Sequence, residues 1–309
     1  MKHRIRQAMG LIVAAATMAA AVAQERPGPL TLTVHPLKGG AYWVEGGVSN
    51  TAFIVGDKGV IVFDAQKTTE AAQQQLAEIA KVTSKPVDRI IISHGDPDHI
   101  GGLLAYPAGI EIISQENTSA VVRASAADPT GGPVYAELYN ALLHRLPTHS
   151  VGATESVTLD GVRMQLIYVA PAHTSGDLVV YLPAQKIVFA GDIITTNTGR
   201  FPVVHIDGSS LGWISTMKTL LALDADTYVS GHGAIETKAQ LQARLRDAEQ
   251  RREQIKTLVA QGKSAAEVEQ ALPEPGSSPM FLDYTQTVYK ELTKGYPQAN
   301  PPWANLIRK

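Results

Sequence analysis

The densest group of chemically active side chains lies in one short loop. Two histidines and two aspartates fall within a few residues of each other: His94, Asp96, Asp98 and His99. Their spacing does not fit one face of a helix, and Pro97 interrupts it. The apolar run 90–92 before them is typical of a strand, and a loop after a strand can turn all four side chains inward. This pattern indicates a metal site; the alternative is a polar turn in which an aspartate caps the next helix.

Three more candidate ligands follow apolar runs further along the chain. His173 comes shortly after the run 162–169, Asp192 follows 187–190, and His232 follows 227–230. A lone histidine in a loop is more often a solvated or capping residue than a ligand. Four strand ends that carry such side chains, however, would provide rigid supports around an open cleft. Together with the loop 94–99, they predict one metal centre.

The elements that must position these side chains fall into two similar halves. Glycine-punctuated apolar runs predict strands at 30–34, 41–44, 51–55, 60–63, 90–92, 110–113, 156–159, 162–169, 178–182, 187–190 and 227–230. Apolar residues at helical spacing predict helices at 69–82, 116–126, 134–146, 211–223, 237–260 and 281–292, and a capping box at 264–267 opens another. Two sheets packed face to face, with helices outside, would bury these strands.

Several residues near the expected cleft are candidates for contact with substrate. The segment 128–150 interrupts the alternation of strands and helices, and we expect it to be an insertion that covers substrate. Tyr135 lies in this insertion, and Arg200 and His205 follow Asp192; we expect these three to contact substrate or to support the metal ligands. Three other histidines lie in no motif and are expected to be surface or packing residues: His35, His144 and His149.

Composition limits the class of protein and the kind of metal site. The chain has 309 residues, 44% of them hydrophobic, which is enough for one domain with a sizeable core. The net charge of −2 and the lack of a basic run give no sign of a nucleic-acid partner, so we expect a small-molecule substrate. The chain has no cysteine, so nitrogen and oxygen donors must hold any metal.

The first residues have the pattern of a secretory signal peptide. A basic start is followed by the apolar run 11–20, and Ala21-Val-Ala23 is a typical cleavage site. We therefore expect residues 1–23 to be removed and the mature protein to be periplasmic or secreted. The remaining 24–309 should form a single domain, with a core at about 30–233 and helices at 234–309. No second apolar segment is long enough to cross a membrane.

The motifs, taken in order, resemble those of the metallo-β-lactamase superfamily. The resemblance covers roughly residues 30–233 and includes a strand-end Asp64, the loop 94–99 in place of H-x-H-x-D-H, a lone His173, Gly-Asp192 and Gly-His232. It implies an α+β fold, the four-layer αββα sandwich of two mixed sheets flanked by helices. This agrees with the elements predicted above.

The resemblance also implies a set of ligands for two divalent metal ions. The first ion would take His94, residue 96 and His173, and the second would take Asp98, His99 and His232. Asp192 would bridge the two ions, and Asp64 would orient a ligand. The family usually has histidine where this chain has Asp96. Zinc is the expected metal, and the carboxylate at 96 also admits iron or manganese.

The chemistry implied is hydrolysis of an ester, thioester, lactone or amide by metal-activated water, with Asp98 and Asp192 as catalytic residues. Asp192 is typical of lactonases and hydroxyacylglutathione hydrolases, whereas β-lactamases of this superfamily generally have Cys or Ser there. Three alternatives remain open: a β-lactamase proper, a di-iron oxidoreductase of the same fold, which has a carboxylate near position 96, and a protein that binds metal without turnover.

Overall fold

The computed structural model describes residues 31–127, 133–205, 207–275 and 282–295. The described residues, all from Thr31 onward, belong to one compact unit. The expected signal peptide at 1–23 lies outside the described residues. Among the helices that are described, none is long and apolar enough to cross a membrane.

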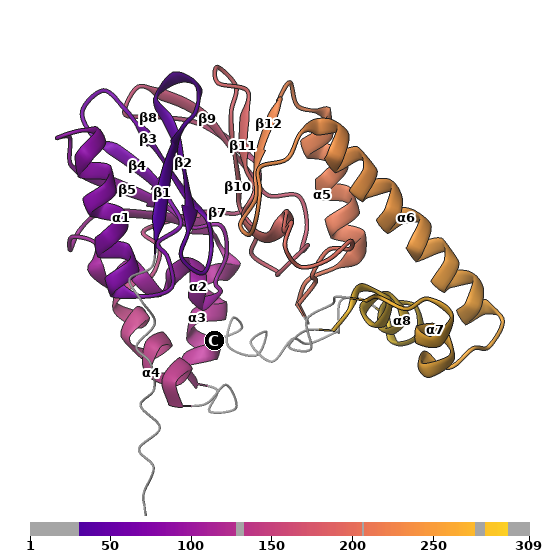
Figure 1. The fold of residues 1–309 in the computed structure, drawn as a ribbon. Coiled ribbons are helices and arrows are strands. Elements are labelled where there is room, and N and C mark those ends of the chain that lie inside the picture. Colours follow the sequence, from indigo (N-terminus) through magenta and orange to yellow (C-terminus); the bar gives the residue numbers. More distant parts are fainter. Residues whose placement is uncertain (1–30, 128–132, 206, 276–281, 296–309) are drawn as a thin grey trace, which may run out of the picture. The chain divides into compact units, whose positions relative to one another are not determined.

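A seven-stranded mixed sheet forms the first half of the fold, with its strands in sequence order (Figure 1). The strands β1 to β4 pair antiparallel, and β4 to β7 pair parallel. Their bounds are β1 Leu32–Pro36, β2 Ala41–Gly46, β3 Thr51–Val55, β4 Val60–Phe63, β5 Val87–Ile91, β6 Glu111–Gln115 and β7 His149–Val151. Every residue of β4 is buried, as expected for a strand that is covered on both faces.

A five-stranded mixed sheet forms the second half, in the order β12-β11-β10-β9-β8. Only β11 and β12 pair parallel, and the other neighbours are antiparallel. The bounds are β8 Glu155–Leu159, β9 Val162–Ile167, β10 Val179–Leu182, β11 Ile187–Phe189 and β12 Thr227–Val229.

Three apolar clusters divide the fold into four layers. One cluster contains residues of both sheets, such as Ile61 and Leu166, and therefore lies between them. A second packs the outer face of the larger sheet against α1 (Thr69–Val82), α3 (Asn117–Ala127) and α4 (Pro133–Leu142). The third packs the smaller sheet against α5 (Ser210–Ala222), α6 (Lys238–Ala260) and the C-terminal helices α7 (Ala265–Ala271) and α8 (Tyr284–Lys294). The expected αββα sandwich is confirmed.

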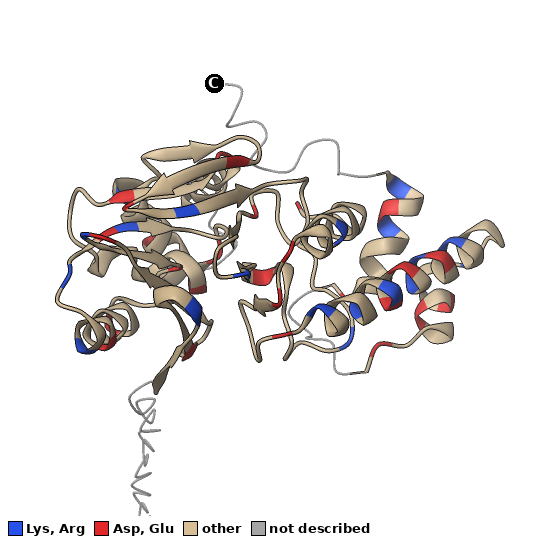
Figure 2. Ribbon diagram, turned by 90° about the horizontal axis from the view of Figure 1, so that it is seen from above, with Lys and Arg blue, Asp and Glu red and all other residues tan. Residues whose placement is uncertain are grey.

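Helix bounds follow local capping. Thr68 accepts a hydrogen bond from the Ala71 N–H, and the following helix has the predicted bounds 69–82. The capping box predicted at 264–267 is present, and Ser209 caps α5. Along α6, Lys and Arg positions are interspersed with Asp and Glu positions (Figure 2).

One strand was not expected from the sequence. The sequence predicts an insertion at 128–150. The last two residues of this segment, together with Val151, form β7, which pairs parallel with β6. The run is short and begins with two polar residues, so it has no strand pattern of its own. Its pairing depends on β6, which is distant in sequence. Residues 128–132 lie outside the described part.

Candidate metal centre

The structure brings the seven expected ligands together at one end of the sheets. The loop 94–99 follows β5 and includes the short helix α2 (Pro97–Ile100). His173 lies between β9 and β10, while Asp192 and His232 follow β11 and β12. Most of these side chains line a cavity of about 500 Å³. Strand ends of both sheets therefore contribute ligands to one site.

Two groups of donors correspond to the two expected ions. In the first group, the Nε2 atoms of His94 and His173 lie 3.4 and 3.6 Å from Asp96 Oδ2. In the second, the Nε2 atoms of His99 and His232 lie 3.6 and 3.1 Å from Asp98 Oδ2. We call these groups the first site and the second site.

Asp192 lies between the two groups. Its Oδ1 is 3.3 Å from His99 Nε2, and its Oδ2 is 3.2 Å from His232 Nε2. The same Oδ2 is 3.7 Å from His173 Nε2 of the first site. A carboxylate in this position can bridge two cations.

Hydrogen bonds orient two of the imidazoles. The buried Asp64 carboxylate accepts the Ser93 N–H at 2.7 Å, the Ser93 hydroxyl at 2.7 Å and His99 Nδ1–H at 2.8 Å. Because the Ser93 hydroxyl donates to Asp64, its lone pair accepts from His94 Nδ1 at 2.9 Å. In the neutral form, both rings would therefore carry their proton on Nδ1 and present an unprotonated Nε2 to the site. Ser93 was not identified from the sequence.

His173 is oriented by the backbone. Its Nδ1–H donates to the Val203 carbonyl at 3.0 Å, which again leaves Nε2 facing the site. The buried Asp177 carboxylate accepts the Thr174 N–H and hydroxyl and so fixes the turn that carries His173.

Glycines allow the close backbone contacts that support the loop. A Cβ on Gly102 would lie 2.0 Å from the Ala65 carbonyl oxygen, and one on Gly231 would lie 1.9 Å from Asp192 Oδ1. Neither position can accept a larger residue without movement of the backbone or of a ligand. Asn50 holds the His232 loop from the other sheet through its N–H to Gly231 O and its side chain to Gly233 O.

The charges of the site stabilise each other. Burial opposes protonation of His99, but the Asp192 and Asp64 carboxylates outweigh it and hold the pKa of His99 well above its usual range. Burial likewise opposes ionisation of Asp192, but His99 and His232 hold the pKa of Asp192 well below its usual range. Against burial, Asp96 and Asp192 raise the pKa of His173 to about 10. The same carboxylates can therefore stabilise bound cations.

The donor set fits divalent metal ions. The Nε2 atoms of His94, His99 and His173 and the Oδ1 of Asp192 are buried and have no hydrogen-bond partner among the described residues. Such groups are costly to bury unless a ligand satisfies them. Three overlapping sets have the spacing of metal ligands: His94–Asp96–His173, His94–His99–Asp192 and Asp98–His99–His232.

The cavity wall is largely apolar and includes residues from distant segments. Tyr135 and Tyr139 of α4 line it, so part of the segment 128–150 lies at the cavity. Tyr139 is buried and donates to the Gly95 carbonyl at 3.1 Å. Val48 and Lys67 also line the cavity and were not identified from the sequence, since no motif marks them.

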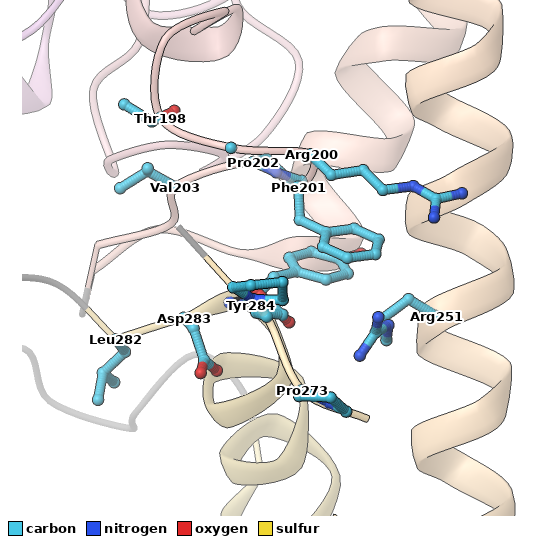
Figure 3. Close-up of a pocket in the computed structure, with 13 residues that line it drawn as sticks. Thr198, Arg200, Phe201, Pro202, Val203, Arg251, Pro273, Leu282, Asp283 and Tyr284 are labelled. Atoms are coloured by element: carbon cyan, nitrogen blue, oxygen red, sulfur yellow. Dashed lines mark hydrogen bonds between the residues drawn. The ribbon is translucent and has the colours of Figure 1, made fainter. Parts of the chain in front are cut away.

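Arg200 lies away from the metal ligands. Its guanidinium donates two hydrogen bonds to Asp247, at 2.7 and 2.6 Å. It lines a neighbouring cavity of about 360 Å³, which shares Thr198 and Val203 with the first (Figure 3). In that cavity, the Phe201 ring stacks on the Tyr284 ring with 5.7 Å between the centroids, and the Arg251 guanidinium lies over the Phe201 ring. The structure therefore does not bring Arg200 into the metal centre, because its guanidinium pairs with Asp247, a residue of α6.

His205, in contrast, does lie at the metal ligands. Its Nε2 is 3.5 Å from Asp96 Oδ2, and its ring lies 4.3 Å from that of His173. His35 pairs with Glu45, and His149 with Glu155, away from the cavity.

Comparison with known proteins gives relatives of several activities. The chain is 29% identical over 208 residues to the 2,4-dinitroanisole O-demethylase subunit alpha of Nocardioides sp., covering 65% of this chain and 58% of that protein. It is 24% identical to a linear primary-alkylsulfatase of Pseudomonas sp., covering 57% and 40%. It is 31% identical to the hydroxyacylglutathione hydrolase of Rhodobacter capsulatus, covering 46% and 47%. The chain thus spans about half the length of these relatives.

Solved structures show the same fold. An inverting sec-alkylsulfatase from Pseudomonas sp. superimposes with a TM-score of 0.67 at 16% identity, covering 89% of this chain and 52% of that one. A metallo-beta-lactamase from Pontibacter korlensis gives 0.59 at 18% identity, covering 71% and 99%. The model of the metallo-beta-lactamase superfamily matches residues 44–232. That match spans most of both sheets and every expected ligand, and the chain therefore belongs to the metallo-beta-lactamase superfamily.

Proposed function

We propose that this protein is an exported hydrolase that uses two divalent metal ions, most favourably zinc, to cleave an ester, thioester, lactone or amide bond in a small molecule. The observation that carries the proposal is the convergence of seven His and Asp side chains in one cavity, with buried donor atoms that lack partners among the described residues. Relatives that hydrolyse small molecules, such as hydroxyacylglutathione hydrolase, support it.

The position of each residue indicates its role in the proposed reaction. When bound, the two ions would supply Lewis-acid polarisation of the substrate and lower the pKa of an attacking water. Asp98 Oδ2 is a donor of the second site, 3.1 Å from His232 Nε2, so the Asp98 carboxylate would orient the water there and could accept its proton on the other oxygen. Asp192 contacts donors of both sites and would hold the two ions at a fixed separation.

The wall of the cavity favours a substrate with an apolar group next to the bond that breaks. Val48, Pro97, Tyr135, Tyr139 and Val203 provide apolar surface, and Lys67 provides a cation. An apolar group would gain from burial against the two tyrosine rings. A substituted phenyl ester is therefore a suitable first probe. Aryl ether and alkyl sulfate substrates belong in the same panel, because two relatives act on such compounds.

Metal analysis combined with a substrate panel tests the proposal. The purified protein should contain two divalent ions per chain and hydrolyse at least one ester, thioester, lactone or amide, and a chelator should abolish this activity. His232→Ala should lose the second ion and the activity. His149→Ala is the matched control, because His149 lies on β7 away from the cavity.

The outcomes separate the alternatives. A protein that binds no metal, or a His232→Ala variant with two ions and full activity, would overturn the proposal. Preferential cleavage of β-lactams would instead identify a β-lactamase. Iron together with oxygen consumption would identify an oxidoreductase, and bound metal without any turnover would identify a binding protein.

A further inference from the structure

We propose that His205 is a protein ligand of the first metal ion and supplies the imidazole that Asp96 replaces in the sequence motif. The inference rests on the proposed metal centre. It adds His205 to His94, Asp96, His173 and the bridging Asp192, so that the first site has five protein donors instead of four.

The distances around Asp96 have the size of a coordination shell. The Nε2 atoms of His94, His173 and His205 lie 3.4, 3.6 and 3.5 Å from the same oxygen, Asp96 Oδ2. These are longer than hydrogen bonds between charged groups, which are about 2.7–2.9 Å. Two atoms that are each about 2.0–2.1 Å from one zinc ion, at the tetrahedral angle, are about 3.3–3.4 Å apart. The three imidazoles thus surround Asp96 at the spacing of co-ligands rather than of direct hydrogen bonds.

The backbone fixes His205 beside His173. The His205 N–H donates to the His173 carbonyl at 2.7 Å, and His173 Nδ1–H donates to the Val203 carbonyl two residues earlier. The two rings are tilted at 50° with centroids 4.3 Å apart. Both side chains therefore approach the site from two segments that are joined by hydrogen bonds, and neither can move without the other.

Residues 208–210 also pack against the segment that carries His173. The Ser209 N–H donates to the Ala172 carbonyl at 2.7 Å, and a Cβ on Gly208 would lie 2.2 Å from the His173 carbonyl oxygen. Ser209 then caps α5, and the buried Glu291 of α8 accepts the Ser210 N–H at 2.7 Å. The backbone of His205 is thus held between the His173 carbonyl, which accepts its N–H, and the Gly208 N–H, which donates to its carbonyl.

The chemistry of the donors supports this role. Without His205, the donors of the first ion would be two imidazoles, His94 and His173, and two carboxylates, Asp96 and the bridging Asp192. His205 restores three nitrogen donors, which suit zinc better than an oxygen-rich set does. With the bridging Asp192, the first ion would then have five protein donors, whereas the second ion would have four. The second site, beside Asp98, would therefore have more room for water and substrate.

Cobalt(II) binding tests the assignment without measuring catalysis. The variants are His205→Ala, Asp96→His, the double variant, and His149→Ala as the control. Each chelator-treated protein is titrated with Co²⁺ while the visible ligand-field absorption is recorded, and circular dichroism checks the fold. The unmodified protein should bind two ions per chain, and His149→Ala should match it.

We expect His205→Ala to lose the first ion and the double variant to regain it. In His205→Ala, the affinity of the first site should fall by more than about a hundredfold, because loss of an outer partner alone typically costs 10–100-fold. Its absorption bands should change, since one nitrogen donor is lost. The double variant should regain the first ion, because the histidine introduced at position 96 would supply the missing imidazole.

Either of two results in His205→Ala would overturn the role of His205. One is binding of both ions with the spectrum of the unmodified protein. The other is a weakened first site with an unchanged spectrum, which would make His205 a residue that only positions Asp96. A double variant no better than His205→Ala would also contradict compensation at position 96. Failure of the unmodified protein to bind any Co²⁺ would instead refute the proposed function.

Discussion

Replacement of Asp64 by asparagine should weaken the second metal site selectively. Asp64 Oδ1 accepts the Ser93 N–H, while its Oδ2 accepts both the Ser93 hydroxyl and His99 Nδ1–H. An amide cannot satisfy all three donors. If its oxygen faces the Ser93 N–H, its NH2 faces His99, which must then accept at Nδ1 and carry its proton on Nε2, where the metal binds.

The opposite orientation of the new amide is no better, because it places the NH2 against the Ser93 N–H in a buried position. Loss of a hydrogen bond that orients a ligand typically lowers metal affinity 10–100-fold, which corresponds to about 1.4–2.7 kcal/mol. We expect a loss of this size at the second site. The first site should lose less, because the Ser93 hydroxyl that supports His94 can rotate to another acceptor.

Asp160→Asn is the matched control. Both aspartates have a left-handed backbone, with φ of 60° at Asp64 and 47° at Asp160, and asparagine tolerates this conformation. Asp160 accepts the Lys58 and Gly59 N–H groups beside the β8–β9 turn, away from the metal ligands. Competition with a chromophoric zinc chelator measures both affinities. An unchanged second site in Asp64→Asn, or an equal loss in Asp160→Asn, would refute the tautomer argument.

Three further predictions concern stability and processing. Without metal, the protein should become less stable between pH 7 and 10. Against the effect of burial, Asp96 raises the pKa of His173 to about 10, and Asp192 raises the pKa of His232 to about 9. The stability that comes from protonation of these two histidines is complete below about pH 6.5 and is lost as the pH rises through their pKa values in the folded protein. On the order of 2 kcal/mol, or roughly 4–8 °C, should be lost in thermal unfolding, and the metal-loaded form should change less. Glu291→Ala should lower the free energy of unfolding in urea by about 3–5 kcal/mol, more than Glu291→Gln, because it leaves the largely buried Arg252 unpaired. N-terminal sequencing of the protein from its host should begin at or near Gln24, and an intact Met1 in the soluble fraction would contradict cleavage after Ala23.

Local signals predicted much of the fold. Helix α1 has the predicted bounds because its cap, Thr68, and its apolar spacing lie within the segment itself. The all-apolar β4 was predicted for the same reason. Strand β7 could not be predicted, because two of its three residues are polar and its pairing with β6 is a long-range contact.

The same distinction applies to the site. The donors in the loop 94–99 could be recognised because the motif is compact and follows a strand. His205 could be placed only near the ligands, because its position depends on the packing of its backbone against His173. Arg200 was expected near substrate, but its ion pair with Asp247 crosses from a loop to α6, and nothing in the local sequence indicates that partner.

The metal ligands come from both sheets, so bound ions would affect how the sheets separate during unfolding. The loop 94–99 belongs to the seven-stranded sheet, whereas His173, Asp192 and His232 belong to the five-stranded one. Bound ions would thus cross-link the two halves of a chain that has no cysteine, much as disulfides cross-link many exported proteins. Separation of the sheets would require release of both ions, so hydrogen exchange in the two sheets should be coupled when metal is bound and independent after chelation. Scarcity of metal in the surroundings would then act on the lifetime of the folded protein as well as on its activity.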